Sequence, residues 1–140
     1  MNFIASWGVH NESDLRAGNR MTVTTSADVE ALVERLAKAT SQAAKIIHQA
    51  RPPVRSALSG ELEPDHMLWA GIWQGYGYLI FGDDEDLWFP VGDPASPVYH
   101  SDSDEYDAGS GLPIETFTEA LKEFLATAHR PTCVEWRATL

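Results

Sequence analysis

The segment from residue 67 to residue 81 constrains the fold of this chain more than any other. Two strongly apolar runs flank the pair Gln74-Gly75, and an X-Gly pair in that position is typical of a two-residue β-hairpin turn. A turn of this length fixes the register, so that Trp73 faces Tyr76, Gly71 faces Tyr78 and Trp69 faces Ile80. Because side chains alternate along a strand, the hairpin has two different faces. The aliphatic face consists of Leu68, Ala70, Ile72, Leu79 and Phe81. The other face is mainly aromatic and consists of Met67, Trp69, Trp73, Tyr76 and Tyr78.

The two faces predict different neighbours. The aliphatic face suits packing against helices. Aromatic side chains with polar tips suit a half-solvated surface or a protein interface, although Trp and Tyr also cover a core from its rim, and both roles remain open here. The hairpin is followed by an acidic turn, Asp83–Asp86, and by a returning strand, Leu87–Phe89.

Two segments have the pattern of amphipathic helices. The first follows a short strand at Met21–Thr24, is capped by Thr25 with Asp28 three residues later, and extends to about Ala39. The second begins at Pro113 and ends before Pro131, with His129 and Arg130 expected in its last turn. Both have apolar residues at helical spacing: Val29, Leu32, Val33 and Leu36 in the first, and Ile114, Phe117, Ala120, Leu121, Phe124, Leu125 and Ala128 in the second.

Weaker signals complete the expected fold. Further strands are expected at Lys45–Gln49, Val98–His100 and Thr132–Trp136, and loops at Ser56–Asp65 and Asp102–Asp107. Cys133 then lies in an apolar strand, as a small buried side chain. The sequence therefore predicts an α+β fold, a mostly antiparallel sheet of about six strands with two helices packed on one face. We expect a single domain at residues 21–140, an N-terminal extension of uncertain order at residues 1–20, and Met21 as a candidate natural start.

Charge is distributed unevenly along the chain. The 140 residues include 10 basic and 21 acidic side chains, a formal net charge of −11. Between Arg55 and Lys122 there is no Lys or Arg, and this central part contains 14 of the acids. Such a chain does not suit direct binding to nucleic acid or to an anionic membrane, whose phosphates are met by basic side chains. It suits a cationic partner, although acidic loops can also serve solubility alone.

Cysteine content and the absence of long apolar runs indicate the compartment. The single cysteine excludes a disulfide framework and a thiolate-rich metal site, and favours a reducing environment. The first residues have no basic segment followed by an apolar run of the kind that signal peptides have, and no stretch reaches the roughly 20 apolar residues of a membrane span. We therefore expect a cytoplasmic protein without a membrane segment.

No motif indicates catalysis, a metal or a cofactor. His10-Asn11-Glu12 matches half of the zinc-deaminase signature, whose other half needs two cysteines. The acidic run Asp102–Asp107 lacks the glycine and glutamate of an EF-hand loop, and no G-x-S-x-G elbow is present. Central carboxylates are too abundant to mark an active site. The sequence predicts a protein that is not an enzyme and has no catalytic residue, metal or cofactor; a small carboxylate-dependent enzyme is the least favoured alternative.

The C-terminal block carries a family resemblance. The pattern F-x-A-T-x-x-R-P-x-x-x-x-W is formed by Phe124, Ala126, Thr127, Arg130, Pro131 and Trp136. It resembles the end of the immunity-protein family numbered one among those of bacterial polymorphic toxin systems, and the similarity extends from about Met21 to Trp136. The resemblance implies an antitoxin that binds and neutralises the toxic domain of a co-produced secreted effector, above all a deaminase acting on nucleic acid.

This implied partner agrees with the charge of the chain. A domain that acts on nucleic acid needs a positively charged groove, which an acidic surface would cover. We expect acidic turns and nearby aromatic side chains to bind the toxin, and the motif residues Phe124, Arg130, Pro131 and Trp136 to be structural. The free protein would be a monomer or homodimer, and a homo-oligomeric scaffold burying its aromatic face between copies is the other alternative. The candidate toxin-binding residues are Asp83, Asp84, Glu85, Asp86, Asp102, Asp104, Glu105, Asp107, Trp69, Trp73 and Tyr76.

Overall fold

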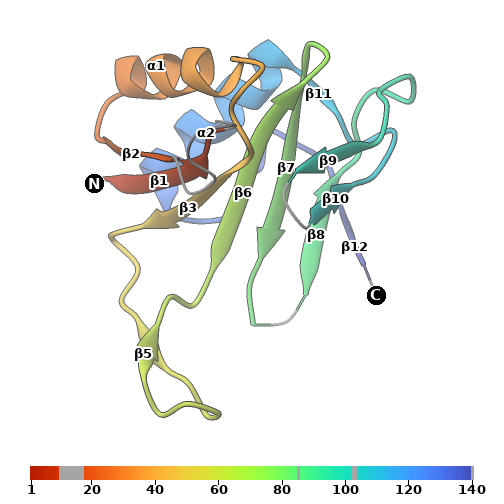
Figure 1. Ribbon diagram of the computed structural model, residues 1–140. Coiled ribbons are helices and arrows are strands. Elements are labelled where there is room, and N and C mark those ends of the chain that lie inside the picture. The colour runs from red at the N-terminus through yellow and green to blue at the C-terminus, as the bar shows by residue number, and fades with distance from the viewer. Residues whose placement is uncertain (10–17, 85, 102–103, 140) are drawn as a thin grey trace.

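The structure is a computed structural model that describes residues 1–9, 18–84, 86–101 and 104–139. The helices and strands are α1 (Ser26–Leu36), α2 (Ile114–Thr127), β1 (Phe3–Gly8), β2 (Gly18–Val23), β3 (Ala44–His48), β4 (Val54–Arg55), β5 (Leu62–Glu63), β6 (Met67–Trp73), β7 (Tyr76–Gly82), β8 (Leu87–Pro90), β9 (Tyr99–Ser101), β10 (Asp104–Tyr106), β11 (Leu112–Pro113) and β12 (Trp136–Ala138). Seven strands follow the order β12-β8-β7-β6-β3-β1-β2, and β11 adds to β7 as the eighth strand of this sheet. Both helices lie on one side of it (Figure 1), which confirms the α+β class, with more strands than expected.

The central hairpin has the register expected from its turn. Trp73 pairs with Tyr76, and the ladder continues to Met67 opposite Gly82. Gln74 and Gly75 both have positive φ, 49° and 82°, as a type I′ turn requires. The aliphatic face of the hairpin packs in the main core with the apolar stripes of α1 and α2.

The helix ends depend on their caps. The Thr25 side chain accepts a hydrogen bond from the Asp28 N–H (3.1 Å), and the Asp28 carboxylate accepts one from the Thr25 N–H (3.2 Å), so the expected capping box is confirmed. In the second helix Pro113 is the N-cap instead of the first helical residue. The C-cap of α2 is Ala128, which has a φ of 62° and donates its N–H to the Phe124 carbonyl (2.8 Å). His129 and Arg130 therefore lie beyond the helix, and the expectation that they form its last turn is wrong.

The N-terminal segment contributes an interior strand. β1 lies between β2 and β3, and Ile4 is the Cα partner of both Thr22 and Ile47. Phe3 and Ala5 are completely buried against the helices. Part of the segment expected from the sequence to be an extension is therefore built into the sheet.

A second, smaller layer covers the other face of the sheet. The β9–β10 hairpin lies in front of β7 in Figure 1, and its Tyr99 and Tyr106 pack against Tyr78, which is fully buried. A Cβ at Gly71 would lie 2.8 Å from the Tyr99 ring, so only glycine allows this approach. The expectation that the acidic run Asp102–Asp107 forms a loop is therefore partly wrong, because Asp104–Tyr106 forms a strand anchored by a buried tyrosine.

The chain after α2 also differs from expectation. Only Trp136–Ala138 forms the last strand, and Cys133 is exposed instead of buried. The carboxylate of Glu123 accepts hydrogen bonds from the backbone N–H groups of Thr132 and Cys133, which holds these residues against the helix and away from the sheet. Within the described ranges, no helix is both long enough and apolar enough to span a membrane.

Candidate functional site

The acidic turn between β7 and β8 is stabilised by its own carboxylates. Asp83 accepts a hydrogen bond from the Asp86 N–H (3.0 Å), and Asp86 accepts bonds from the Leu87 N–H (2.7 Å) and the Thr139 hydroxyl (2.6 Å). Two of the candidate acids therefore shape the turn and attach it to the end of the chain. Asp84 is exposed, whereas Glu85 lies outside the described residues.

The second group of acids lies on the β9–β10 hairpin and the residue after it. Asp107 forms an ion pair with Arg137, which neutralises it locally. Glu105 is exposed and lies 3.7 Å from the equally exposed His100, and Asp104 is half-buried. Asp102 is outside the described part of the chain. Glu105 is thus the most accessible of the described acids in this group.

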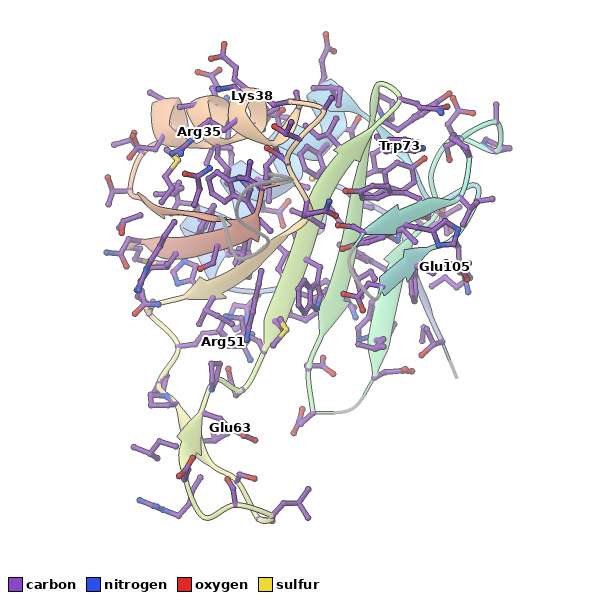
Figure 2. All side chains as sticks on the ribbon, viewed as in Figure 1. Arg35, Lys38, Arg51, Glu63, Trp73 and Glu105 are labelled. Atoms are coloured by element: carbon purple, nitrogen blue, oxygen red, sulfur yellow. The ribbon has the colours of Figure 1, made fainter. Side chains whose placement is uncertain are left out.

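The three candidate aromatic residues lie toward opposite ends of the β6–β7 hairpin. Trp73 is 44% exposed and stacks on Tyr99, with ring centroids 5.9 Å apart. Tyr76 is half-buried and donates its hydroxyl hydrogen to Asp93 (3.1 Å). Trp69 lies four residues before Trp73 along β6, about 13 Å at strand spacing, and contributes to a groove beside the acidic turn. All three aromatic candidates therefore border the cluster of Tyr78, Tyr99 and Tyr106, and Figure 2 shows Trp73 and Glu105 on the same side of the molecule. The acidic turn lies at the other end of β7 from Tyr76, so the structure does not bring all the candidate residues together.

A protruding segment, residues 52–64, contains β4 and β5 and extends away from the sheet in Figure 1; we call it the arm. The groove runs between the arm and the turn after β7. We call it the acidic groove, because four carboxylates and no Lys or Arg are among the described residues that line it. The lining residues are Val54, Glu63, Pro64, Asp65, His66, Met67, Trp69, Gly82, Asp83, Asp84 and Leu87. Of these, only Trp69, Asp83 and Asp84 were candidates from the sequence, because the sequence shows no link between the arm and the turn.

An ion pair closes the base of the arm. The Arg51 guanidinium lies 2.8 Å from the Asp65 carboxylate and also donates to the Ala128 carbonyl at the end of α2 (3.2 Å). Asp65 in turn accepts a hydrogen bond from His66 Nδ1 (2.8 Å). Burial alone would raise the pKa of Asp65, but these hydrogen bonds and the positive charge of Arg51 lower it overall.

Two buried histidines continue this network into the core. His66 Nε2 accepts a hydrogen bond from the His48 N–H (2.9 Å), so Nδ1 carries the proton that His66 donates to Asp65. His48 Nδ1 accepts from the Ala50 N–H (3.1 Å), which leaves its Nε2–H to donate to the Leu125 carbonyl (2.8 Å). Both rings are therefore neutral in this arrangement. Burial lowers the pKa of His66, although the neighbouring Asp65 acts in the opposite direction.

The family-motif residues make contacts within the molecule. Phe124 is fully buried, with its ring centroid 5.9 Å from that of Phe3. The Arg130 guanidinium carbon lies 3.8 Å from the centroid of the Trp88 ring, a cation–π geometry. Trp136 donates its indole N–H to the Pro131 carbonyl (2.7 Å). These contacts fix the chain that leaves α2 against the sheet.

The described residues contain no group of three or more His, Cys, Asp or Glu side chains arranged to hold a metal ion.

Comparison with known protein families identifies the family of this chain. The model of the family "Immunity protein Imm1" matches residues 17–138. The chain therefore belongs to the Imm1 family of immunity proteins, as its C-terminal pattern indicated. No curated protein matches it.

Proposed function

We propose that this protein is the antitoxin of a cognate secreted toxin domain, a deaminase acting on nucleic acid, and that it neutralises this domain in the cytoplasm by covering its basic active-site groove. The observation that carries the proposal is the family match over residues 17–138, which includes both helices and every strand except β1.

The acidity of the exposed surface supports the deaminase part of the proposal. A toxin that handles nucleic acid presents cationic side chains along its groove. Each exposed ion pair contributes at most about 1 kcal/mol, so acids such as Asp84 and Glu105 would act mainly by accelerating association and selecting a cationic partner. Binding strength would come from apolar and aromatic groups that become desolvated, with Trp69 and Trp73 as candidates.

Inhibition of this kind requires no chemistry from the antitoxin, which acts by occupying a surface. The alternative of a scaffold that buries its aromatic face between copies is less well supported. The β9–β10 hairpin already covers part of that face, since Tyr78 is fully buried against Tyr99 and Tyr106, and Met67, Trp69 and Tyr76 are half-buried.

Co-expression tests the proposal. The gene immediately upstream is expected to encode a secreted protein with a C-terminal toxin domain. Expression of that domain alone should arrest bacterial growth and raise the frequency of deamination mutations, and this protein should reverse both effects and co-purify with the domain. Growth arrest that persists with abundant soluble protein, and no complex on size exclusion, would contradict it.

A further inference from the structure

The geometry points to the arm and the acidic groove at its base as the surface that receives the toxin. Its occupant would be a cationic segment of the toxin domain that also carries apolar side chains, at the rim of its nucleic-acid groove. This inference rests on the proposed function and adds the arm as a place of contact, which neither the family match nor the sequence indicates; of the groove, the sequence indicated only Trp69, Asp83 and Asp84.

The arm is an ordered structure that contributes little to the rest of the fold. Its hydrogen bonds at residues 55–61 stay within the arm, for example from the Ser56 N–H to the Glu61 carbonyl (2.8 Å) and from the Gly60 N–H to the Ser56 carbonyl (2.9 Å). Nearly all of its side chains are exposed. A hairpin that protrudes in this way is available for contact with another molecule (Figure 2, around Glu63).

Exposed apolar side chains concentrate at this end of the molecule. Eight large apolar residues are exposed in the described part of the chain, and four of them belong to the arm or face it across the groove. These four are Val54 at 46%, Leu58 at 100%, Leu62 at 60% and Leu87 at 48% exposed. Single exposed apolar residues need no explanation, but here Val54 and Leu87 both line the groove and Leu58 and Leu62 lie elsewhere on the arm, and such a concentration is typical of a binding surface.

The arm places charged and apolar side chains on the same side of the groove. Val54 pairs with Glu63 across the two arm strands, so both side chains lie on one face of the arm, and both line the groove. Asp84 and Leu87 lie on the opposite wall, with Met67 and Trp69 also in the lining. An apolar surface bordered by carboxylates complements a segment in which Lys or Arg alternates with apolar residues. A second copy of this chain is a poorer occupant, because a net charge of −11 opposes self-association.

The base of the arm is also held in position before binding. The Arg51–Asp65 ion pair joins its two ends, and Arg51 attaches it to the end of α2. A surface that is already ordered loses less conformational entropy when a partner binds.

The test uses a double variant of the groove and a matched control. Val54→Ser with Leu87→Ser removes one apolar side chain from each wall, at residues 46% and 48% exposed. Val91→Ser with Val98→Ser changes two residues of similar exposure, 50% and 39%, neither of which lines the acidic groove. The probe is the toxin domain encoded by the upstream gene, inactivated by a substitution in its active site, and its Kd is measured by titration calorimetry. Thermal unfolding of both variants verifies that they are folded, and a third variant, Leu58→Ser at the fully exposed tip of the arm, carries no risk to the fold.

We expect the groove variant to raise Kd at least about tenfold and the control variant to leave it within about threefold, since apolar anchors in a desolvated groove dominate binding. Unchanged Kd values for the groove variant and for Leu58→Ser, with tight binding by the wild type, would overturn the assignment of the surface and leave the proposed function standing. No binding by the wild type would overturn both. Self-association of the wild type in sedimentation experiments that the groove variant abolishes would assign the surface to a second copy and overturn the inference.

Discussion

Removal of the first strand is the most informative test of the fold. The Imm1 match begins at residue 17, yet β1 lies between β2 and β3 and buries Phe3 completely. A buried aromatic side chain removes about 150 Å² or more from water, which at about 25 cal/mol per Å² corresponds to about 4 kcal/mol. Phe3→Ala should therefore lower the free energy of unfolding by about 3–5 kcal/mol. A chain that begins at Met21 loses this contact, the buried part of Trp7 and both strand pairings, and should not fold, because domains of this size are stable by only about 5–15 kcal/mol.

Urea denaturation followed by tryptophan fluorescence and circular dichroism measures these effects. Ile4→Ala is the matched control, because Ile4 neighbours Phe3 but is only half-buried, outside the main core. It should cost about 1 kcal/mol or less. A chain beginning at Met21 with the wild-type unfolding midpoint would refute the placement of β1 in the sheet.

Three further predictions concern single side chains. Because burial lowers the pKa of His66, the unfolded chain binds the proton more readily, so the free energy of unfolding should fall as pH decreases below about 6.5, by up to about 1.4 kcal/mol per pH unit. Urea midpoints measured between pH 7 and pH 5 should show this decrease. His66→Gln should weaken the pH dependence, whereas the control His100→Gln, at an exposed residue, should not. Glu123→Gln should lower the free energy of unfolding by about 1–2 kcal/mol, because the charged oxygens accept two backbone N–H groups; wild-type stability in denaturant titrations would contradict this. Asp84→Asn should slow association with the toxin and weaken the salt dependence of the association rate without changing the melting temperature, whereas Asp86→Asn should lower the melting temperature. Stopped-flow mixing measures the association rate and thermal unfolding measures the melting temperature. An unchanged association rate for Asp84→Asn at low salt would contradict a role of Asp84 in electrostatic steering.

The parts of the fold that could be predicted are those specified by neighbouring residues. The turn at Gln74-Gly75 fixes seven consecutive pairs of the central hairpin, and the Thr25–Asp28 capping box begins α1. β1 alternates apolar residues at Phe3, Ala5 and Trp7, a signal that was present, but its two partners lie up to 45 residues away and no local turn reveals them.

Tertiary hydrogen bonds explain the remaining differences. Cys133 is exposed because a carboxylate 10 residues earlier holds its backbone, a contact that an apolar sequence pattern does not report. In the candidate site, the sequence indicated the acidity of the turn after β7 but not that Asp83 and Asp86 shape it. It also gave no sign that the arm would lie beside that turn, because Ser56–Asp65 reads only as a polar loop.

Competition with nucleic acid tests the proposed mode of inhibition most directly. A fluorescent single-stranded oligonucleotide bound to the inactivated toxin domain reports occupancy of the toxin's groove through its anisotropy. If this acidic protein covers the groove, it should displace the oligonucleotide completely at one equivalent. A stable ternary complex, in which the toxin holds antitoxin and oligonucleotide together, would contradict that mechanism.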